Sequence, residues 1–346
     1  MEIQTQSCIV KGVKNVDIFQ QELHYNESDN TQTLVKITRG GICGSDLHYY
    51  QHGKVGNYSI QHPMILGHEV IAKVEKTNAP NLKVGQKVAI NPSKPCMQCK
   101  YCLSGDTNQC ETMRFFGSAM YIPHVDGGFT QYKVVDNEQC IPYDQGASDD
   151  VMTFAEPLAV AIHAAKQAGD LENKTVFISG VGPIGCLIVS AVKHLGAKEI
   201  ICTDISSRCL NIASQMGATE VLHANDDFTK YLQHKGEFNI SFEVSGHPSS
   251  IERCLSVTKA RGTIVQVGMG GAVPSFPIMP LIAKEINWKG SFRFVEEFNT
   301  AVEWLSNGKI NPLPLLSKII PFMELEKALE LAGNKDEISK IQLIFE

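Results

Sequence analysis

The chain has 346 residues and a mass of 38.0 kDa, which exceeds the size at which single hydrophobic cores stop growing, so we expect two domains. Its formal net charge of −6 and pI near 6.0 exclude the basic surface that nucleic-acid binding requires. No apolar run approaches the about 18 residues of a membrane span, and the first residues lack a secretory pattern, so we expect a soluble cytoplasmic protein.

Residues 1–149 have the pattern of short strands separated by turns with Gly and Pro. Cys43 follows the strand-like run LVKITRGGI in a glycine-rich turn, where the backbone can approach a ligand closely. His68 and Glu69 precede a second strand, VIAKVEK. A thiolate, an imidazole and a carboxylate leave a zinc position open for water or substrate. The alternatives are a packed cysteine and an exposed His-Glu turn.

Four cysteines lie close together in CMQCKYCLSGDTNQC, at C-x2-C-x2-C-x7-C spacing: Cys96, Cys99, Cys102 and Cys110. The total of 11 cysteines is odd, and several others lie in apolar runs, so disulfides are not expected. Four thiolates close a tetrahedral shell around zinc and leave no open position, which predicts a structural metal site. Redox thiols and an iron–sulfur cluster remain alternatives.

Glu156 begins an apolar helical segment, AEPLAVAIHA, with Pro157 in its first turn. An acidic residue at this position is often only a partner of the helix dipole. We favour a metal-binding role, because this chain also carries the separate Cys43 and His68 set.

Residues 150–295 alternate between strand and helix patterns. The strand KTVFISG runs into GVGPIG and the helix PIGCLIVSAVKHLGA, and the strand EIICTD ends at Asp204. This arrangement is G-x-G-x-x-G between a strand and a helix, with an acidic residue about 20 positions on. It predicts a dinucleotide site in a doubly wound parallel sheet of the α/β class. The expected cofactor-binding residues are Gly180, Gly182, Pro183, Ile184, Gly185, Asp204, Arg208, Val267 and Gly268.

The choice of cofactor depends on two of these residues. Asp204 would accept hydrogen bonds from the adenosine ribose and repel a 2′-phosphate, which favours NAD. Arg208 could reach a 2′-phosphate, so NADP stays possible. The strand-end residues, among them Val181, Ser245 and Gly246, could alternatively serve only the turns.

Together, CGSDLHYY, GHE, the four-cysteine segment, AEPLAVAIHA, GVGPIG and GSFRF resemble the zinc-dependent medium-chain dehydrogenases, in their polyol (sorbitol) dehydrogenase branch. The resemblance runs from end to end. It implies a GroES-like β-rich catalytic domain of residues 1–149, completed by 296–346, around a Rossmann domain of residues 150–295. The helix EFNTAVEWLSNG and the strand KIQLIFE would belong to the completing segment. The resemblance further implies two zinc ions per chain, a cleft between the domains as active site, and a homodimer or homotetramer.

By the same resemblance, Cys43, His68 and either Glu69 or Glu156 are the ligands of the catalytic zinc, and both acids stay candidates. The four clustered cysteines correspond to the structural zinc site. Ser45 and His48 occupy the positions where this family relays protons.

The stretches INPSKPC, MRFFGSAMYIPHVDGGFT and FEVSGHPSS resemble bacterial members that act on a sugar acid. A sugar acid carries a carboxylate, which needs a cation or several hydrogen-bond donors. The candidates near these motifs are Lys94, Arg114, Phe116, His124 and Arg293. For Lys94 and Arg114, a solvated charge beside the cysteine cluster is the alternative.

Three other functions compete with a sugar acid dehydrogenase. A sorbitol- or xylitol-type polyol dehydrogenase and an L-threonine-type dehydrogenase belong to the same enzyme class. A zinc-ribbon-type protein that binds nucleic acid or protein belongs to another. The acidic balance and the scarcity of basic residues among the clustered cysteines argue against the last.

Overall fold

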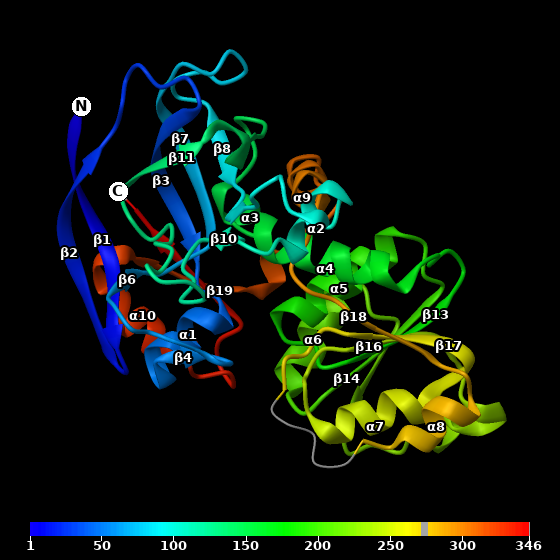
Figure 1. Cartoon of the computed structure of the whole chain (residues 1–346). Coiled ribbons are helices and arrows are strands. Elements are labelled where there is room, and N and C mark those ends of the chain that lie inside the picture. The colour runs from blue at the N-terminus through cyan, green and yellow to red at the C-terminus, as the bar shows by residue number, and fades with distance from the viewer. Residues whose placement is uncertain (271–275, 346) are drawn as a thin grey trace. The chain divides into compact units, whose positions relative to one another are not determined.

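The computed structural model describes residues 1–270 and 276–345 and contains two compact units (Figure 1). Unit 1 comprises Met1–Glu156, Phe298–Gly308 and Leu316–Glu346, and unit 2 comprises Pro157–Glu297 and Lys309–Leu315. No helix in the described part of the chain is long and apolar enough to cross a membrane.

The larger sheet of unit 1 joins strands from both ends of the chain. In spatial order it runs β12 (Cys140–Pro142), β8 (Lys87–Ile90), β7 (Glu69–Thr77), β3 (Gln32–Gly41), β20 (Lys340–Ile344) and β19 (Leu316–Pro321), with β11 (Tyr132–Asp136) also paired to β3. The predicted strands LVKITRGGI, VIAKVEK and KIQLIFE are confirmed as β3, β7 and β20. Because β20 is antiparallel to β3, with Gln342 opposite Gly41, the segment before it reaches the turn that carries Cys43.

The remaining elements of unit 1 are short, apart from one long hairpin. That hairpin pairs β1 (Glu2–Gly12) with β2 (Asn15–His24), and β6 (Met64–Ile65) joins its other edge. The other strand pairs are β4 (Lys54–Val55) with β5 (Tyr58–Ser59), and β9 (Ser93–Lys94) with β10 (Arg114–Phe115). The helices are α1 (Gly44–His52), α2 (Lys100–Leu103), α3 (Asp149–Met152), α9 (Glu297–Ser306) and α10 (Leu325–Ala332).

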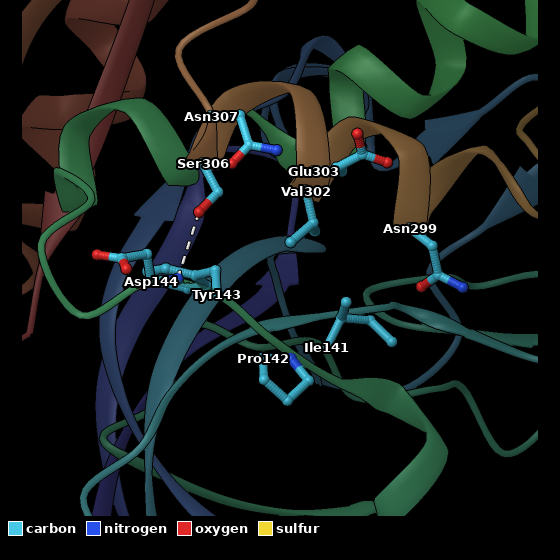
Figure 2. Close-up of a pocket in the computed structure, with 9 residues that line it drawn as sticks. All are labelled: Ile141, Pro142, Tyr143, Asp144, Asn299, Val302, Glu303, Ser306 and Asn307. Atoms are coloured by element: carbon cyan, nitrogen blue, oxygen red, sulfur yellow. Dashed lines mark hydrogen bonds between the residues drawn. The ribbon is translucent and has the colours of Figure 1, made fainter.

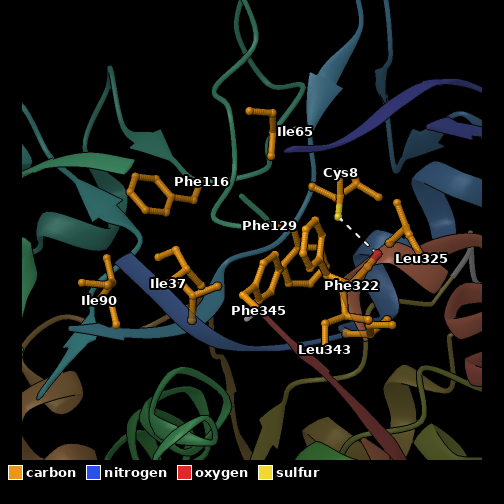
Figure 3. Close-up of a cluster of buried hydrophobic side chains, with 14 of the residues drawn as sticks. Cys8, Ile37, Ile65, Ile90, Phe116, Phe129, Phe322, Leu325, Leu343 and Phe345 are labelled. Atoms are coloured by element: carbon orange, nitrogen blue, oxygen red, sulfur yellow. Dashed lines mark hydrogen bonds between the residues drawn. The ribbon is translucent and has the colours of Figure 1, made fainter. Parts of the chain in front are cut away.

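The core of unit 1 centres on aromatic side chains, as Figure 3 shows. Phe322 and Phe345 stack with ring centroids 4.8 Å apart, and Phe129 lies beside Phe345 at 6.3 Å. A Cβ atom on Gly67 would lie only 2.1 Å from the Phe129 ring, so the backbone just before His68 packs directly on this core. Each such ring contributes about 1.5–3 kcal/mol by leaving water.

Unit 2 is the doubly wound parallel sheet that the sequence predicts. Its strand order is β15 (Glu220–His223), β14 (Glu199–Asp204), β13 (Thr175–Ser179), β16 (Phe238–Glu243), β17 (Thr258–Gln266) and β18 (Asn287–Gly290). The chain therefore reverses its direction of travel between β13 and β16, the position at which such sheets bind ligands. The α/β fold class is confirmed.

The helices of unit 2 cover both faces of this sheet. They are α4 (Ala155–Ala168), α5 (Pro183–His194), α6 (Ser207–Met216), α7 (Pro248–Val257) and α8 (Ile278–Ala283). In Figure 1, α7 and α8 lie on the opposite side of the sheet from α5, as right-handed crossovers require when the strand order reverses. The predicted helix EFNTAVEWLSNG is confirmed as α9.

Candidate functional site

The four clustered cysteines come together between β9 and β10. Their Sγ atoms all lie within 4.8 Å of one another, and the cysteines of the chain are free thiols. Cys110 Sγ accepts a hydrogen bond from the Cys96 amide at 3.2 Å, and Cys96 Sγ accepts one from the Cys99 amide at 3.4 Å. The amides of Gln98 and Cys99 lower the pKa of Cys96 to about 6. These thiols fit a closed four-coordinate zinc site.

A second potential metal site brings Cys43, His68 and Glu69 together, with one ligand atom of each within 4.8 Å of the others. Cys43 caps α1 directly after β3, and Glu69 is the first residue of β7. The antiparallel pairing of β3 with β7 sets Gly41 opposite Glu69, which carries the His68 turn next to the Cys43 turn. Three ligands of these types leave a fourth zinc position open.

Asp46 ties these two turns together, and the sequence analysis did not identify it. Its fully buried carboxylate accepts a hydrogen bond from the Cys43 amide at 2.9 Å and another from the Gly67 amide at 3.1 Å. Burial raises the pKa of Asp46, while the nearby His68 opposes this rise. Asp46 therefore fixes the spacing between the turns that carry Cys43 and His68.

Lys340 is the second residue that the sequence analysis missed. Its buried ammonium donates to Glu69 Oε1 at 2.6 Å and to the Ile42 carbonyl at 3.0 Å. Glu69 Oε2 is buried and has no hydrogen-bond partner. A Cβ atom on Gly41 would lie 2.2 Å from this oxygen, so glycine leaves the space that it occupies. A buried carboxylate oxygen without a partner is what a metal ion would satisfy.

The negative charge around His68 also favours a metal ion at this site. Burial disfavours the protonated imidazole, yet Cys43, Asp46 and Glu156 raise the pKa of His68 to about 10. Glu156 is 6 % exposed in the first turn of α4, and it lies outside the set of atoms within 4.8 Å. This excess of buried negative charge fits a bound dication, and the geometry favours Glu69 over Glu156 as a direct ligand.

Ser45 and His48 lie three residues apart on α1, and therefore on one face of the helix. Ser45 is half-buried and His48 is exposed. Partial burial, together with His52 and Lys335, lowers the pKa of His48. Its imidazole is therefore neutral near pH 7 and able to accept a proton.

The glycine-rich loop of unit 2 has the shape that a dinucleotide phosphate requires. Gly180 has φ of 94°, and a Cβ atom on Gly185 would lie 2.1 Å from the Gly180 carbonyl oxygen. A Cβ atom on Gly182 would meet nothing within 4 Å, so the backbone there is open to a ligand. Pro183 and Ile184 begin α5, whose first amides lack partners within the helix.

Asp204 and the strand-end residues complete this edge of the sheet. Asp204 ends β14 and accepts hydrogen bonds from the amides of Val181 (2.8 Å) and Ser206 (2.9 Å). Arg208 follows on α6. The amides of Val267 and Gly268 donate to the carbonyl of Glu243 at 2.8 and 2.9 Å.

The candidate substrate residues have varied surroundings. Lys94 pairs with Asp136 at 2.6 Å, and Arg114 donates to the Pro123 carbonyl. Phe116 is part of the unit 1 core, with its position shown in Figure 3. His124 accepts hydrogen bonds from the amides of Gln61 and His62, so it ties its loop to the segment that follows β5. Arg293 belongs to unit 2, where its φ is 53°.

A pocket with a volume of about 410 Å³ lies in unit 1, between β12 and α9 (Figure 2). Ser306 accepts a hydrogen bond from the Asp144 amide at its rim. None of the predicted site residues lines it: its walls are Ile141, Pro142, Tyr143, Asp144, Asn299, Val302, Glu303, Ser306 and Asn307. It is separate from both candidate metal sites.

The fold and these sites define a zinc-binding dehydrogenase, and comparisons with known proteins agree. The family model "Zinc-binding dehydrogenase" matches residues 183–307, and "Alcohol dehydrogenase GroES-like domain" matches residues 29–145. The chain belongs to the zinc-binding medium-chain dehydrogenases.

Among its relatives is the L-idonate 5-dehydrogenase (NAD(P)(+)) of Escherichia coli strain K12, which is 62 % identical over 346 residues, 100 % of each chain. A crystal structure of L-idonate 5-dehydrogenase from E. coli K-12 superposes with a TM-score of 0.98 and covers 100 % of this chain and 99 % of that one. A probable D-xylulose reductase A of Aspergillus clavatus is 33 % identical over 94 % of this chain and 93 % of its own. The predicted resemblance to sugar acid enzymes within a polyol branch is confirmed.

Proposed function

We propose that this protein is a zinc-dependent NAD(P) dehydrogenase that oxidises L-idonate at C5 to 5-keto-D-gluconate and catalyses the reverse reduction. The observation that carries the proposal is the 62 % identity to an L-idonate 5-dehydrogenase over the full length of both chains. Cys43, His68 and Glu69 supply the metal ligands that this chemistry requires. Oxidation of a polyol is the second candidate, because the more distant relatives include xylulose reductases at 33 % identity.

The reaction would use the chain's residues in distinct roles. A zinc ion held by Cys43, His68 and Glu69 would act as a Lewis acid on the substrate oxygen. Ser45 would pass the hydroxyl proton on, and His48, neutral because its pKa is lowered, would accept it. A nicotinamide cofactor held at the strand ends of unit 2 would supply the hydride acceptor for this oxidation.

The same proposal covers the cofactor and the structural metal. Gly180, Gly182 and Gly185 with the start of α5 would hold the pyrophosphate, and Asp204 would favour NAD without excluding NADP. The related enzyme's name includes both cofactors. Cys96, Cys99, Cys102 and Cys110 would hold a second zinc ion that stabilises their loop.

We further propose a catalytic domain of residues 1–149 and 296–346 around a cofactor domain of residues 150–295, which the two compact units support. The free thiols support a reducing, cytoplasmic location. Self-association into a homodimer or homotetramer is supported by exposed apolar side chains on α8, Ile278, Met279 and Ile282. The neighbouring β18 ends the sheet in the described part of the chain.

The test is a comparison of initial rates with NAD⁺ on L-idonate, sorbitol, xylitol and L-threonine. One charge-assisted contact to the carboxylate contributes about 1.5–3 kcal/mol, so kcat/KM for L-idonate should exceed that for sorbitol by about 10- to 100-fold. Equal rates on sorbitol and L-idonate would replace this proposal with the polyol enzyme.

Two variants locate the contact to the carboxylate. Replacing a residue that binds the carboxylate should lower activity on L-idonate selectively. Replacing a residue that orients hydroxyls should lower activity on both L-idonate and sorbitol. We expect Arg293→Ala to show the selective loss. Lys94→Ala should change little, because Asp136 already pairs with Lys94. Arg261→Ala, at an exposed arginine of unit 2, is the matched control.

A further inference from the structure

Glu243, the last residue of β16, carries a fully buried carboxylate that the proposed mechanism does not use. Its Oε1 atom accepts hydrogen bonds from the amides of Ser245 and Gly246, each at 3.0 Å, and from the Ser245 hydroxyl at 2.7 Å. Ser250 Oγ lies 2.7 Å from the same oxygen and 2.6 Å from Ser179 Oγ. The carboxylate therefore holds the loop of residues 244–247 against the start of α7 and the end of β13.

The same side chain also reaches the loop that follows β17. Gln266 Nε2 donates to Glu243 Oε2 at 2.5 Å and to the Gly268 carbonyl at 2.9 Å. The backbone carbonyl of Glu243 accepts the amides of Val267 and Gly268. One residue thus connects the loop of residues 244–247 to the loop of residues 267–270.

These loops touch each other through backbone rather than through side chains. A Cβ atom on Gly268 would lie 2.2 Å from the Gly246 amide nitrogen, and one on Gly246 would lie 2.5 Å from the Gly270 nitrogen. A Cβ atom on Gly180 would lie 2.8 Å from the Ser245 nitrogen, so the glycine-rich loop joins the same assembly. Since no side chain separates these segments, the hydrogen bonds to Glu243 determine their spacing.

We propose that Glu243 is a positioning residue of the cofactor site, which fixes the two strand-end loops in the shape that receives the nicotinamide half of the dinucleotide. The inference rests on the proposed dehydrogenase function. In a doubly wound sheet, each half binds one mononucleotide at the carboxyl ends of its strands. The loops that Glu243 joins follow β16 and β17, in the half that does not carry the glycine motif.

Glu243→Gln tests this role because an ionised carboxylate only accepts hydrogen bonds, whereas an amide places an NH₂ group against donors. Turning that NH₂ group toward Gln266 would make Gln266 flip, and Gln266 would then lose its bond to the Gly268 carbonyl. Two measurements follow: amide hydrogen exchange in residues 244–247 and 267–270 without ligand, and equilibrium binding of NADH and of AMP. AMP probes only the adenosine half.

We expect faster exchange in both loops and an NADH Kd raised by about 10-fold, equivalent to roughly 1.4 kcal/mol, because the loops lose part of their charge-assisted hydrogen bonding. The AMP Kd should change by less than about 2-fold, because the glycine loop and Asp204 remain. If Glu243 had a merely structural role, the replacement would raise the Kd values of AMP and NADH together. Glu252→Gln, at an exposed position on α7 of the same unit, should leave the exchange and both Kd values unchanged.

A milder variant keeps the test valid if Glu243→Gln does not fold. Gln266→Met leaves the Glu243 carboxylate in place and removes the side-chain bridge from this carboxylate to the Gly268 carbonyl. This variant should also raise the NADH Kd, by about 3-fold. Unchanged exchange and NADH binding in the variants would overturn the role of Glu243 alone. Absence of NADH binding by the wild-type protein would overturn the proposed function as well, and the two failures are thus distinguishable.

Discussion

Lys340 and Glu69 form a buried ion pair in unit 1, with Nζ 2.6 Å from Oε1 and side chains that are 5 % and 1 % exposed. The pair joins β20 to the first residue of β7, across 271 positions of sequence. It also leaves the second oxygen of Glu69 available to a metal, so it links the stability of the sheet to the candidate metal site.

Removing the cation should leave the buried Oε1 atom of Glu69 without its charged partner. We expect Lys340→Met to lower the free energy of unfolding by about 3–5 kcal/mol, measured by urea denaturation. Lys327→Met, which breaks an exposed pair with Glu324, is the control and should cost no more than about 1 kcal/mol. A loss below 1 kcal/mol for Lys340→Met would show that the pair does not stabilise unit 1.

The two candidate zinc sites should lose metal independently. Elemental analysis should find about two zinc ions per chain in the wild-type protein and about one in either Cys43→Ala or Cys99→Ser. Only Cys99→Ser should also lower the thermal midpoint substantially, because the loop between β9 and β10 loses its cross-link. Cys209→Ser, outside both sets, should keep both ions. A value near one zinc ion per chain in the wild-type protein would contradict the presence of two zinc sites.

The acid limb of the pH–rate profile should report His48. Its pKa is lowered by partial burial, His52 and Lys335, so the neutral, proton-accepting form persists below the ordinary pKa of 6.5. Activity in the direction of oxidation should therefore fall only below that pH. Lys335→Met removes a positive charge that opposes protonation, so the pKa rises and the limb moves to higher pH.

Lys83→Met is the control for this shift, because Lys83 is exposed in unit 1 and is not among the charges that act on His48. The measurement is kcat/KM from pH 5 to 9 for both variants, which gives the pH of each acid limb. An acid limb that stays in place in Lys335→Met would remove His48 from the proton path.

Cofactor preference should depend on the charge of Asp204. Asp204→Asn keeps an oxygen for the Val181 amide and removes the negative charge that repels a 2′-phosphate. The ratio of kcat/KM for NADP to that for NAD should then rise by about 10-fold, equivalent to roughly 1.4 kcal/mol. Asp227→Asn, at an exposed acid that accepts hydrogen bonds from Thr229 in its own turn, should leave the ratio unchanged. A wild-type preference for NADP would instead identify Arg208 as the determinant.

The features that spacing alone predicted are local in the chain, whereas the distant members of the candidate metal site and of the catalytic domain were predicted from the family resemblance. EIICTD is β14 residue for residue, and the four cysteines lie within one loop, so spacing alone brings them together. Asp46 and Lys340 were missed for different physical reasons. Asp46 is a short polar residue within a motif already explained by Cys43. Lys340 reaches Ile42 across 298 positions, through strand pairing that no local pattern encodes.

The place of β20 in unit 1 has a consequence for synthesis of the chain. β20 lies between β3 and β19, yet it follows the whole of unit 2 in sequence. At 5–20 residues per second, the ribosome needs roughly 10 to 40 s to pass from Glu156 to Lys340. During that time the Arg39–Gly41 end of β3 lacks its β20 partner, although β11 and β7 can already pair with β3, and Glu69 lacks its ion pair with Lys340. Unit 2 can therefore fold before the large sheet of unit 1 is complete. A nascent chain stalled before Lys340 should contain a folded unit 2 and an incomplete metal site in unit 1.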